Sequence, residues 1–142
     1  MSISNAPLVG PVIGLALWTF FMEIWLYSYR LPDITTYKVQ VPNGASIAEL
    51  NKNIPRHRQY PADNYNHLHE QPTVFYAVAL GLTFLEVNDS LTVALAWAYV
   101  GARIVHSLIQ STSNAIMLRF QVFALSGAVL LAMTLRGAVN AF

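Results

Sequence analysis

The chain has 142 residues, a formal net charge of +1 with neutral histidines, and no cysteine. Hydrophobic residues make up 55% and charged residues 11%, whereas soluble domains carry about 25% charged residues. The composition therefore excludes a soluble bundle in which every helix has a polar face. The near-zero charge gives no electrostatic basis for nucleic-acid binding, and the missing cysteines exclude disulfides and thiolate metal sites.

The first predicted element is a membrane-spanning helix over residues 8–29. A helix needs about 20 mainly apolar residues to cross the hydrocarbon core, and Glu23 is the only charged residue in this stretch. Pro32 follows shortly after the stretch, so we expect the helix to end near residue 30.

Residues 30–63 are polar and rich in proline, which predicts an extramembrane loop. Ser46 and Glu49 have the spacing of a capping box, in which each side chain caps the backbone N–H of the other residue. We therefore expect one short surface helix inside the loop.

Three further spans are predicted, over residues 66–86, 91–110 and 119–135. Pro72 is expected to kink the first of them. The connections between the three spans are short, and short connections make consecutive helices antiparallel neighbours. The sequence thus predicts an all-α, up-and-down bundle of four membrane helices, forming one domain over residues 1–142.

The basic residues predict how the bundle is oriented, because cytoplasmic loops are enriched in Lys and Arg. Most of them lie in or beside the long loop, namely Arg30, Lys38, Lys52, Arg56 and Arg58, or open the last span, as Arg119 does. Arg136 alone lies at the opposite end. We expect the long loop to be cytoplasmic and both termini to be non-cytoplasmic.

The third span carries four polar side chains on one helical face. Tyr99, Arg103, His106 and Gln110 are separated by four, three and four residues, and such positions are neighbours on a helix surface. A charged residue in hydrocarbon costs roughly 2.5–3.5 kcal/mol even on lenient scales. The stripe should therefore face the bundle interior or a neighbouring subunit.

Depth along the helices suggests partners for this stripe. Glu23 and Arg103 lie at a similar distance from the cytoplasmic end, so an ion pair between them is plausible. Glu70 lies level with His106. Arg119 lies at the start of its helix, where the positive end of the macrodipole disfavours a cation. We therefore expect a carboxylate or a bound anion near Arg119.

Other interpretations of these residues stay open. The Glu23–Arg103 pair could simply lock two helices together, and Glu70 could cap backbone groups freed by the following proline. His67 and His69 lie at the water boundary, where most histidines are solvated. A metal held by His67, His69 and His106 matches no standard zinc spacing, so we expect no metal. No nucleophile–base pair is readable, and the catalytic residues are left unassigned.

Two stretches together resemble the MAPEG family, the membrane-associated proteins in eicosanoid and glutathione metabolism, and in particular its bacterial members. The first is the helix entry from Asn66 to Tyr76, with Glu70 and Pro72. The second combines Arg103 and His106 with Asn114 and with Arg119, which follows the histidine by thirteen residues.

This resemblance implies a homotrimer with glutathione bound between subunits, toward the cytoplasmic side. Carried over by position, the glutathione-binding residues would be Asn66, Glu70, Arg103, His106 and Arg119. The implied activity is that of a glutathione-dependent transferase or peroxidase acting on lipophilic electrophiles that arrive from the bilayer. The implied location is a bacterial inner membrane.

The chain departs from the family at hydroxyl positions, which hold Gln110, Phe120 and Phe123. Tyr99 and Ser107 are the hydroxyls that could replace them. The alternative functions are therefore a non-catalytic scaffold or accessory subunit, and a lipid-binding protein, of the same fold.

Overall fold

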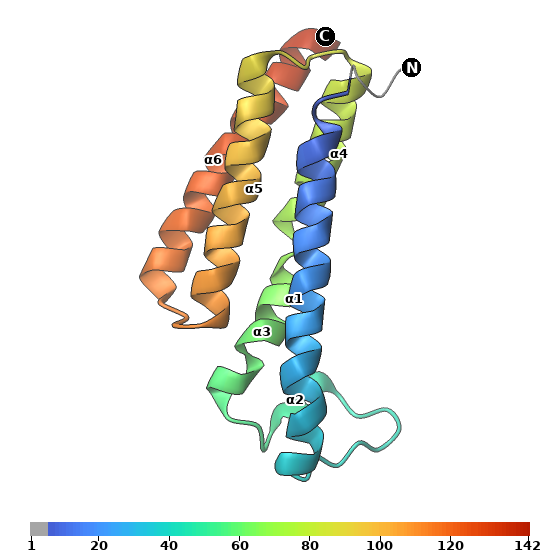
Figure 1. Cartoon of the computed structure of the whole chain (residues 1–142), viewed down its shortest axis with the longest axis vertical. Coiled ribbons are helices and arrows are strands. Elements are labelled where there is room, and N and C mark those ends of the chain that lie inside the picture. Colours follow the sequence, from blue (N-terminus) through green and yellow to red (C-terminus); the bar gives the residue numbers. More distant parts are fainter. Residues whose placement is uncertain (1–5) are drawn as a thin grey trace.

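The computed structural model describes residues 6–142, and the first five residues of the predicted domain lie outside this range. The elements of the described range are α-helices connected by turns and loops (Figure 1). Their bounds are α1 Val9–Thr36, α2 Ile47–Asn51, α3 Arg56–His67, α4 Gln71–Phe84, α5 Ser90–Ser111 and α6 Ile116–Ala141.

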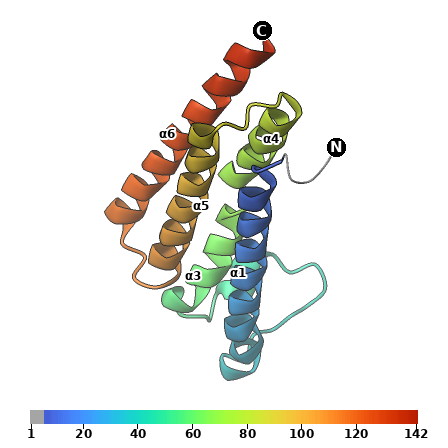
Figure 2. The same cartoon turned by 45° about the horizontal axis from the view of Figure 1, so that its top comes forward.

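Three of these helices, α1, α5 and α6, are long and apolar enough to cross a membrane. They run side by side with α3 and α4, and α5 packs most extensively against α6 (Figures 1 and 2). The start of α1 and the end of α6 lie at one end of the molecule. The loop that contains α2 and the α5–α6 turn lie toward the other end. The up-and-down course predicted from the short connections is confirmed.

The second predicted span is not one helix. Residues 66–86 are divided between the end of α3 and α4, which has 14 residues and so a length of about 21 Å, less than the roughly 30 Å of the hydrocarbon core. Within residues 6–142, three helices are long and apolar enough to cross a membrane, so the predicted count of four membrane helices is not confirmed.

Pro72 explains where the chain breaks. It lies in the first turn of α4, and a proline there has no N–H to bond a carbonyl of the preceding helix. The backbone turns instead at Leu68, His69 and Glu70, whose amides bond to Asn64, Asn66 and His67. The break leaves Glu70 at the N-cap position of α4, directly beside the end of α3.

The first helix is longer than predicted, because α1 continues through Pro32 to Thr36. A proline inside a helix costs about 3 kcal/mol or more, so the last turn needs tertiary support. Asp33 supplies it: this carboxylate is buried and accepts bonds from Arg58 Nη2 at 2.7 Å and Arg58 Nε at 3.0 Å. These hydrogen bonds raise the pKa of Arg58.

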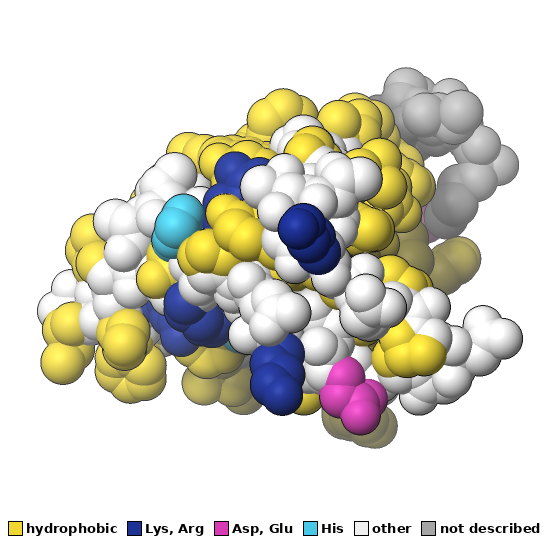
Figure 3. Space-filling view, turned by 90° about the horizontal axis from the view of Figure 1, so that it is seen from below, with side chains coloured by type: hydrophobic (Ala, Val, Ile, Leu, Met, Phe, Trp, Pro, Cys, Tyr) yellow, Lys and Arg dark blue, Asp and Glu magenta, His cyan; other side chains and the backbone are white. Residues whose placement is uncertain are grey.

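The rest of the loop agrees with the sequence prediction. Ser46 and Glu49 form the predicted capping box at the start of α2, and hydrogen bonds to Ser46 lower the pKa of the Glu49 carboxyl. Figure 3 views this end of the molecule, where Lys and Arg side chains are spread between hydrophobic groups. This distribution matches the concentration of basic residues predicted for this end.

Aromatic and aliphatic side chains from the four main helices form the apolar core. Phe75 of α4 stacks on Tyr99 of α5 with ring centroids 4.5 Å apart. Leu15 of α1 and Met133 of α6 belong to the same buried cluster. Full burial of each such side chain contributes about 1.5–3 kcal/mol, so the core fixes the position of α5 relative to α4.

A second polar cluster lies at the end that holds the termini. Asp89 caps α5 and accepts hydrogen bonds from the backbone of Leu91 and from the backbone and hydroxyl of Thr92. It also pairs with Arg136 of α6 at 2.6 Å, and Arg136 Nε donates to the Thr92 hydroxyl at 2.9 Å. We call Asp89, Thr92 and Arg136 the terminal cluster. It ties α5 to α6.

Candidate functional site

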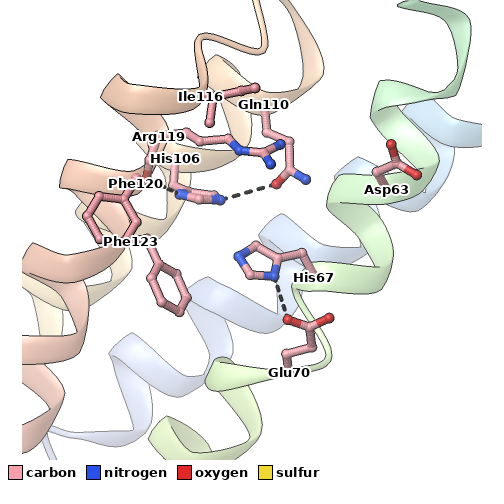
Figure 4. Close-up of a pocket in the computed structure, with 9 residues that line it drawn as sticks. All are labelled: Asp63, His67, Glu70, His106, Gln110, Ile116, Arg119, Phe120 and Phe123. Atoms are coloured by element: carbon pink, nitrogen blue, oxygen red, sulfur yellow. Dashed lines mark hydrogen bonds and ion pairs between the residues drawn. The ribbon is translucent and has the colours of Figure 1, made fainter. Parts of the chain in front are cut away.

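A cleft of about 330 Å³ opens where the α3–α4 break faces the end of α5 and the start of α6 (Figure 4). It combines two carboxylates, two imidazoles, an amide and a guanidinium with three apolar side chains. The lining residues are Asp63, His67, Glu70, His106, Gln110, Ile116, Arg119, Phe120 and Phe123. This is the candidate site.

The polar stripe of α5 faces inward, as predicted. Tyr99 and Arg103 are 0% exposed, His106 is 1% exposed and Gln110 is 6% exposed. Of these, His106 and Gln110 reach the cleft, whereas Tyr99 packs in the core beside Phe75. The stripe therefore runs from the apolar core to the cleft.

Both ring nitrogens of His106 are engaged. Nδ1 lies 3.0 Å from the backbone carbonyl oxygen of Arg119, which can only accept, so Nδ1 carries a proton. Nε2 lies 3.1 Å from the side-chain amide of Gln110. The imidazole thus joins α5 to the first turn of α6 and is held in one orientation.

Arg119 enters the cleft from the start of α6. Asn114, which adopts a left-handed conformation (φ 49°) in the α5–α6 turn, accepts a bond from Arg119 Nη1 at 2.6 Å. Asp63 and Glu70 are the two carboxylates of the cleft, and both lie across it from Arg119 (Figure 4). Neither forms an ion pair with the Arg119 guanidinium, because Asp63 pairs with Arg56 and Glu70 pairs with His67. The cation therefore faces the cleft with hydrogen-bonding capacity to spare.

Glu70 bonds to His67 rather than to His106. Its Oε2 lies 2.6 Å from His67 Nδ1, and its side chain is 67% exposed. His67 stacks loosely on its neighbours, with ring centroids 4.9 Å from His106 and 5.3 Å from Phe123. Glu70 is the N-cap residue of α4, and its carboxylate bonds to the last residue of α3.

Arg103 has a different environment from the one predicted. Glu23 accepts a bond from the Tyr27 hydroxyl at 2.8 Å on an exposed face, so the proposed Glu23–Arg103 pair is not formed. The Arg103 guanidinium lies 5.6 Å from the Phe123 ring centroid. Its three nitrogens have no hydrogen-bond partner among residues 6–142.

Arg103 belongs to a set of buried polar groups between α3 and α5. The others are the amide of Asn64 and the hydroxyls of Ser107 and Ser111, which also lack partners within the described part of the chain. Arg103, Ser107 and Ser111 follow one another at four-residue intervals, so they form one row on α5. Because these atoms are already enclosed within one chain, a neighbouring subunit could not reach them without a rearrangement.

The structure gathers three of the five predicted site residues. Glu70, His106 and Arg119 line the cleft. Arg103 lies behind Phe123, and Asn66 is exposed on α3 outside the lining. Within the described range, no group of three or more His, Asp or Glu side chains is arranged to hold a metal.

Three polar lining residues, Asp63, His67 and Gln110, were not among the predicted site residues. Asp63 was predicted to lie in the loop, and no helical spacing links it to Glu70 because the chain breaks between α3 and α4. His67 was expected to be solvated at the water boundary, and Gln110 was assigned to the polar face of the third span but not to the site.

These observations define an α-helical integral membrane protein with a charged cleft near one end of its bundle. The chain belongs to the MAPEG family, whose model matches residues 8–139. No curated protein and no solved structure matched the chain.

Proposed function

We propose that this protein is a glutathione-dependent transferase or peroxidase that acts on lipophilic electrophiles. The observation that carries the proposal is the single cleft that brings Arg119, His106 and Glu70 together. Family membership supports the same chemistry.

The charges of the cleft complement those of glutathione, which has two carboxylates, one ammonium group and one thiol. The free guanidinium donors of Arg119 suit a carboxylate, and such charge-assisted pairs are the strong hydrogen bonds of proteins. Glu70 uses Oε2 for His67, so its other oxygen can accept from the ammonium group. His106 holds the carbonyl of Arg119 and thereby orients the anion-binding helix end.

The apolar side of the cleft suits a substrate that is dissolved in the bilayer. Ile116 and Phe120 are 70% and 61% exposed, and both belong to the cleft lining on α6. Since α6 has the length and composition of a membrane helix, an electrophile could pass from lipid across these side chains.

The proposal includes an assembly and an orientation. We propose a homotrimer in a bacterial inner membrane, with both termini non-cytoplasmic and the cleft toward the cytoplasm. The basic end of the molecule supports this orientation (Figure 3). The exposed position of Glu70 leaves room for a neighbouring subunit to complete the site.

Binding of glutathione to the purified protein in detergent tests the function. Arg119→Leu removes one charge-assisted contact worth about 1.5–3 kcal/mol, so the dissociation constant should rise roughly 10- to 100-fold. Lys52→Leu is the matched control, because Lys52 is an exposed cation of the polar loop and lies outside the cleft lining. Equal affinity of the two variants, or no binding by the wild type at millimolar glutathione, contradicts the proposal.

One observation favours a second function. None of the nine lining residues carries a hydroxyl, which suits a lipid-binding protein or a non-catalytic scaffold. Native mass spectrometry of gently solubilised protein separates these functions. A retained lipid mass without glutathione binding supports the carrier. A stable oligomer that retains no ligand supports the scaffold.

A further inference from the structure

His67 and Glu70 form a carboxylate–imidazole pair at the edge of the cleft. The Glu70 carboxylate can only accept, so His67 Nδ1 is the donor across the 2.6 Å contact. In the neutral ring the remaining nitrogen, Nε2, then has a lone pair. No described residue bonds to it, and the ring itself lines the cleft (Figure 4).

The other proton acceptors of the cleft are already occupied or are weaker bases. His106 uses Nδ1 for the Arg119 carbonyl and Nε2 for Gln110. Asp63 pairs with Arg56. Carboxylates are in addition much weaker bases toward a thiol than imidazole is. His67 Nε2 is therefore the imidazole nitrogen of the cleft that has no hydrogen-bond partner among the described residues.

We propose that His67 is the general base that takes the thiol proton in this protein, and that Glu70 is the positioning residue that holds its ring. This inference rests on the proposed glutathione function and assigns its proton-transfer step. The Glu70 bond fixes the ring tautomer and stabilises the imidazolium once it forms.

The step balances without any further reactant. The thiol S–H bond breaks and its proton moves to His67 Nε2, leaving a thiolate, which is the reactive nucleophile. With an epoxide as electrophile, the sulfur electron pair forms the S–C bond while the C–O bond breaks. The resulting alkoxide then takes the proton back from His67 and restores the neutral ring.

Charged groups on every side of His67 bear on this proton transfer. Glu70 at the α3–α4 break favours the imidazolium, as does Asp63 on α3. The permanently charged guanidinium groups of Arg103 on α5 and Arg119 on α6 oppose it, as does His106 on α5 when its ring is protonated. Arg103 lies on the far side of Phe123. The thiolate would form beside these cations, which stabilise it.

Thiolate formation and binding can be measured separately on the full-length protein in detergent. Equilibrium dialysis with S-methylglutathione, which has no thiol proton, reports binding. The ultraviolet absorbance of the thiolate reports ionisation of glutathione across a pH series. The conjugation rate with a lipophilic epoxide reports catalysis.

His67→Asn should keep the affinity for S-methylglutathione, lose the thiolate signal at neutral pH and reduce the conjugation rate roughly 10²- to 10⁴-fold. Glu70→Gln should reduce the rate less. His69→Asn is the matched control, since His69 bonds to the Tyr65 carbonyl and does not line the cleft. His67→Gln provides a second variant if the first does not fold.

The outcomes distinguish the two proposals. If the wild type binds neither glutathione nor its S-methyl analogue, the proposed function fails and the inference fails with it. If the wild type binds and ionises glutathione and His67→Asn does so equally, with the same pH dependence of the rate, only the role of His67 is overturned. If His67→Asn loses the thiolate absorbance and His69→Asn keeps it, the proposed roles of His67 and Glu70 are supported.

Discussion

The two ends of the bundle use polar side chains in opposite ways. In the terminal cluster, Asp89 accepts four hydrogen bonds, and Arg136 is bonded to both other members. At the cleft end, Arg103 is fully buried with none of its nitrogens bonded to a described residue. Both ends join α5 to its neighbours, but only at the terminal cluster do the charged side chains bond to one another.

The bonded charges of Asp89 and Arg136 stabilise the fold, whereas the unbonded charge of Arg103 does not. A buried charge without a partner lowers the stability of the folded state, and leaving one unpaired costs about 3–5 kcal/mol. Sites that break the rules of local satisfaction are most often functional sites. The contrast between the two ends therefore supports placing the function at the cleft.

The largest test of this contrast is Arg103→Met, which replaces the unpaired guanidinium with an apolar side chain of similar length. We expect the ligand-free protein to gain about 1–4 kcal/mol of stability. The measurement is the thermal denaturation midpoint in detergent. Arg136→Met is the matched change at the other end, where the same substitution removes two bonded contacts and should lower the midpoint. A lower midpoint for Arg103→Met would mean that this guanidinium has a stabilising partner.

A second test uses the acid sensitivity of the terminal cluster. Hydrogen bonds from Thr92 and Arg136 lower the pKa of Asp89 to about 2 from its ordinary value of 3.8. A carboxyl with a depressed pKa stabilises the folded state above its unfolded pKa and loses that contribution as pH falls toward the folded pKa. Stability should therefore decline between about pH 4 and about pH 2.

Asp89→Asn isolates this effect, because asparagine caps a helix as well as aspartate does. The variant should have a lower denaturation midpoint than the wild type at pH 6, and the two should converge near pH 2. A constant difference across this range would show that the Asp89 charge contributes nothing.

The smallest expected effect compares two buried serines. Ser107 has no partner among the described residues, whereas the Ser126 hydroxyl donates to the Phe123 carbonyl at 2.8 Å. Ser126→Ala should cost about 1 kcal/mol, and Ser107→Ala should cost nothing or be slightly stabilising. Equal losses in denaturation midpoint would indicate that Ser107 is also satisfied.

The sequence predicted what depends on position along one helix. The stripe from Tyr99 to Gln110 is buried as expected, because a 3.6-residue period fixes which side chains share a face. The capping box at Ser46 and Glu49 formed because both partners lie within one turn. Local spacing was sufficient for both.

Relations between helices were harder to predict. Residue counting gave the depth of Glu23 and Arg103 but not the direction in which each side chain points, and the predicted pair did not form. The continuation of α1 past Pro32 depends on Arg58, which is distant in sequence. The break before Pro72 left Glu70 at the N-cap of α4, outside the regular helix predicted over residues 66–86.

The interruption between α3 and α4 gives the two sides of the cleft unequal rigidity. On one side, the short α5–α6 turn and the bond from His106 to the Arg119 carbonyl hold the backbone in place. On the other side, Leu68, His69 and Glu70 lie outside both α3 and α4, and the amides of His69 and Glu70 bond three residues back instead of four. We expect any widening that admits a bulky guest to occur by pivoting of α3 about these three residues. The long helices α1, α5 and α6 would then keep their positions in the bilayer while the cleft widens and narrows.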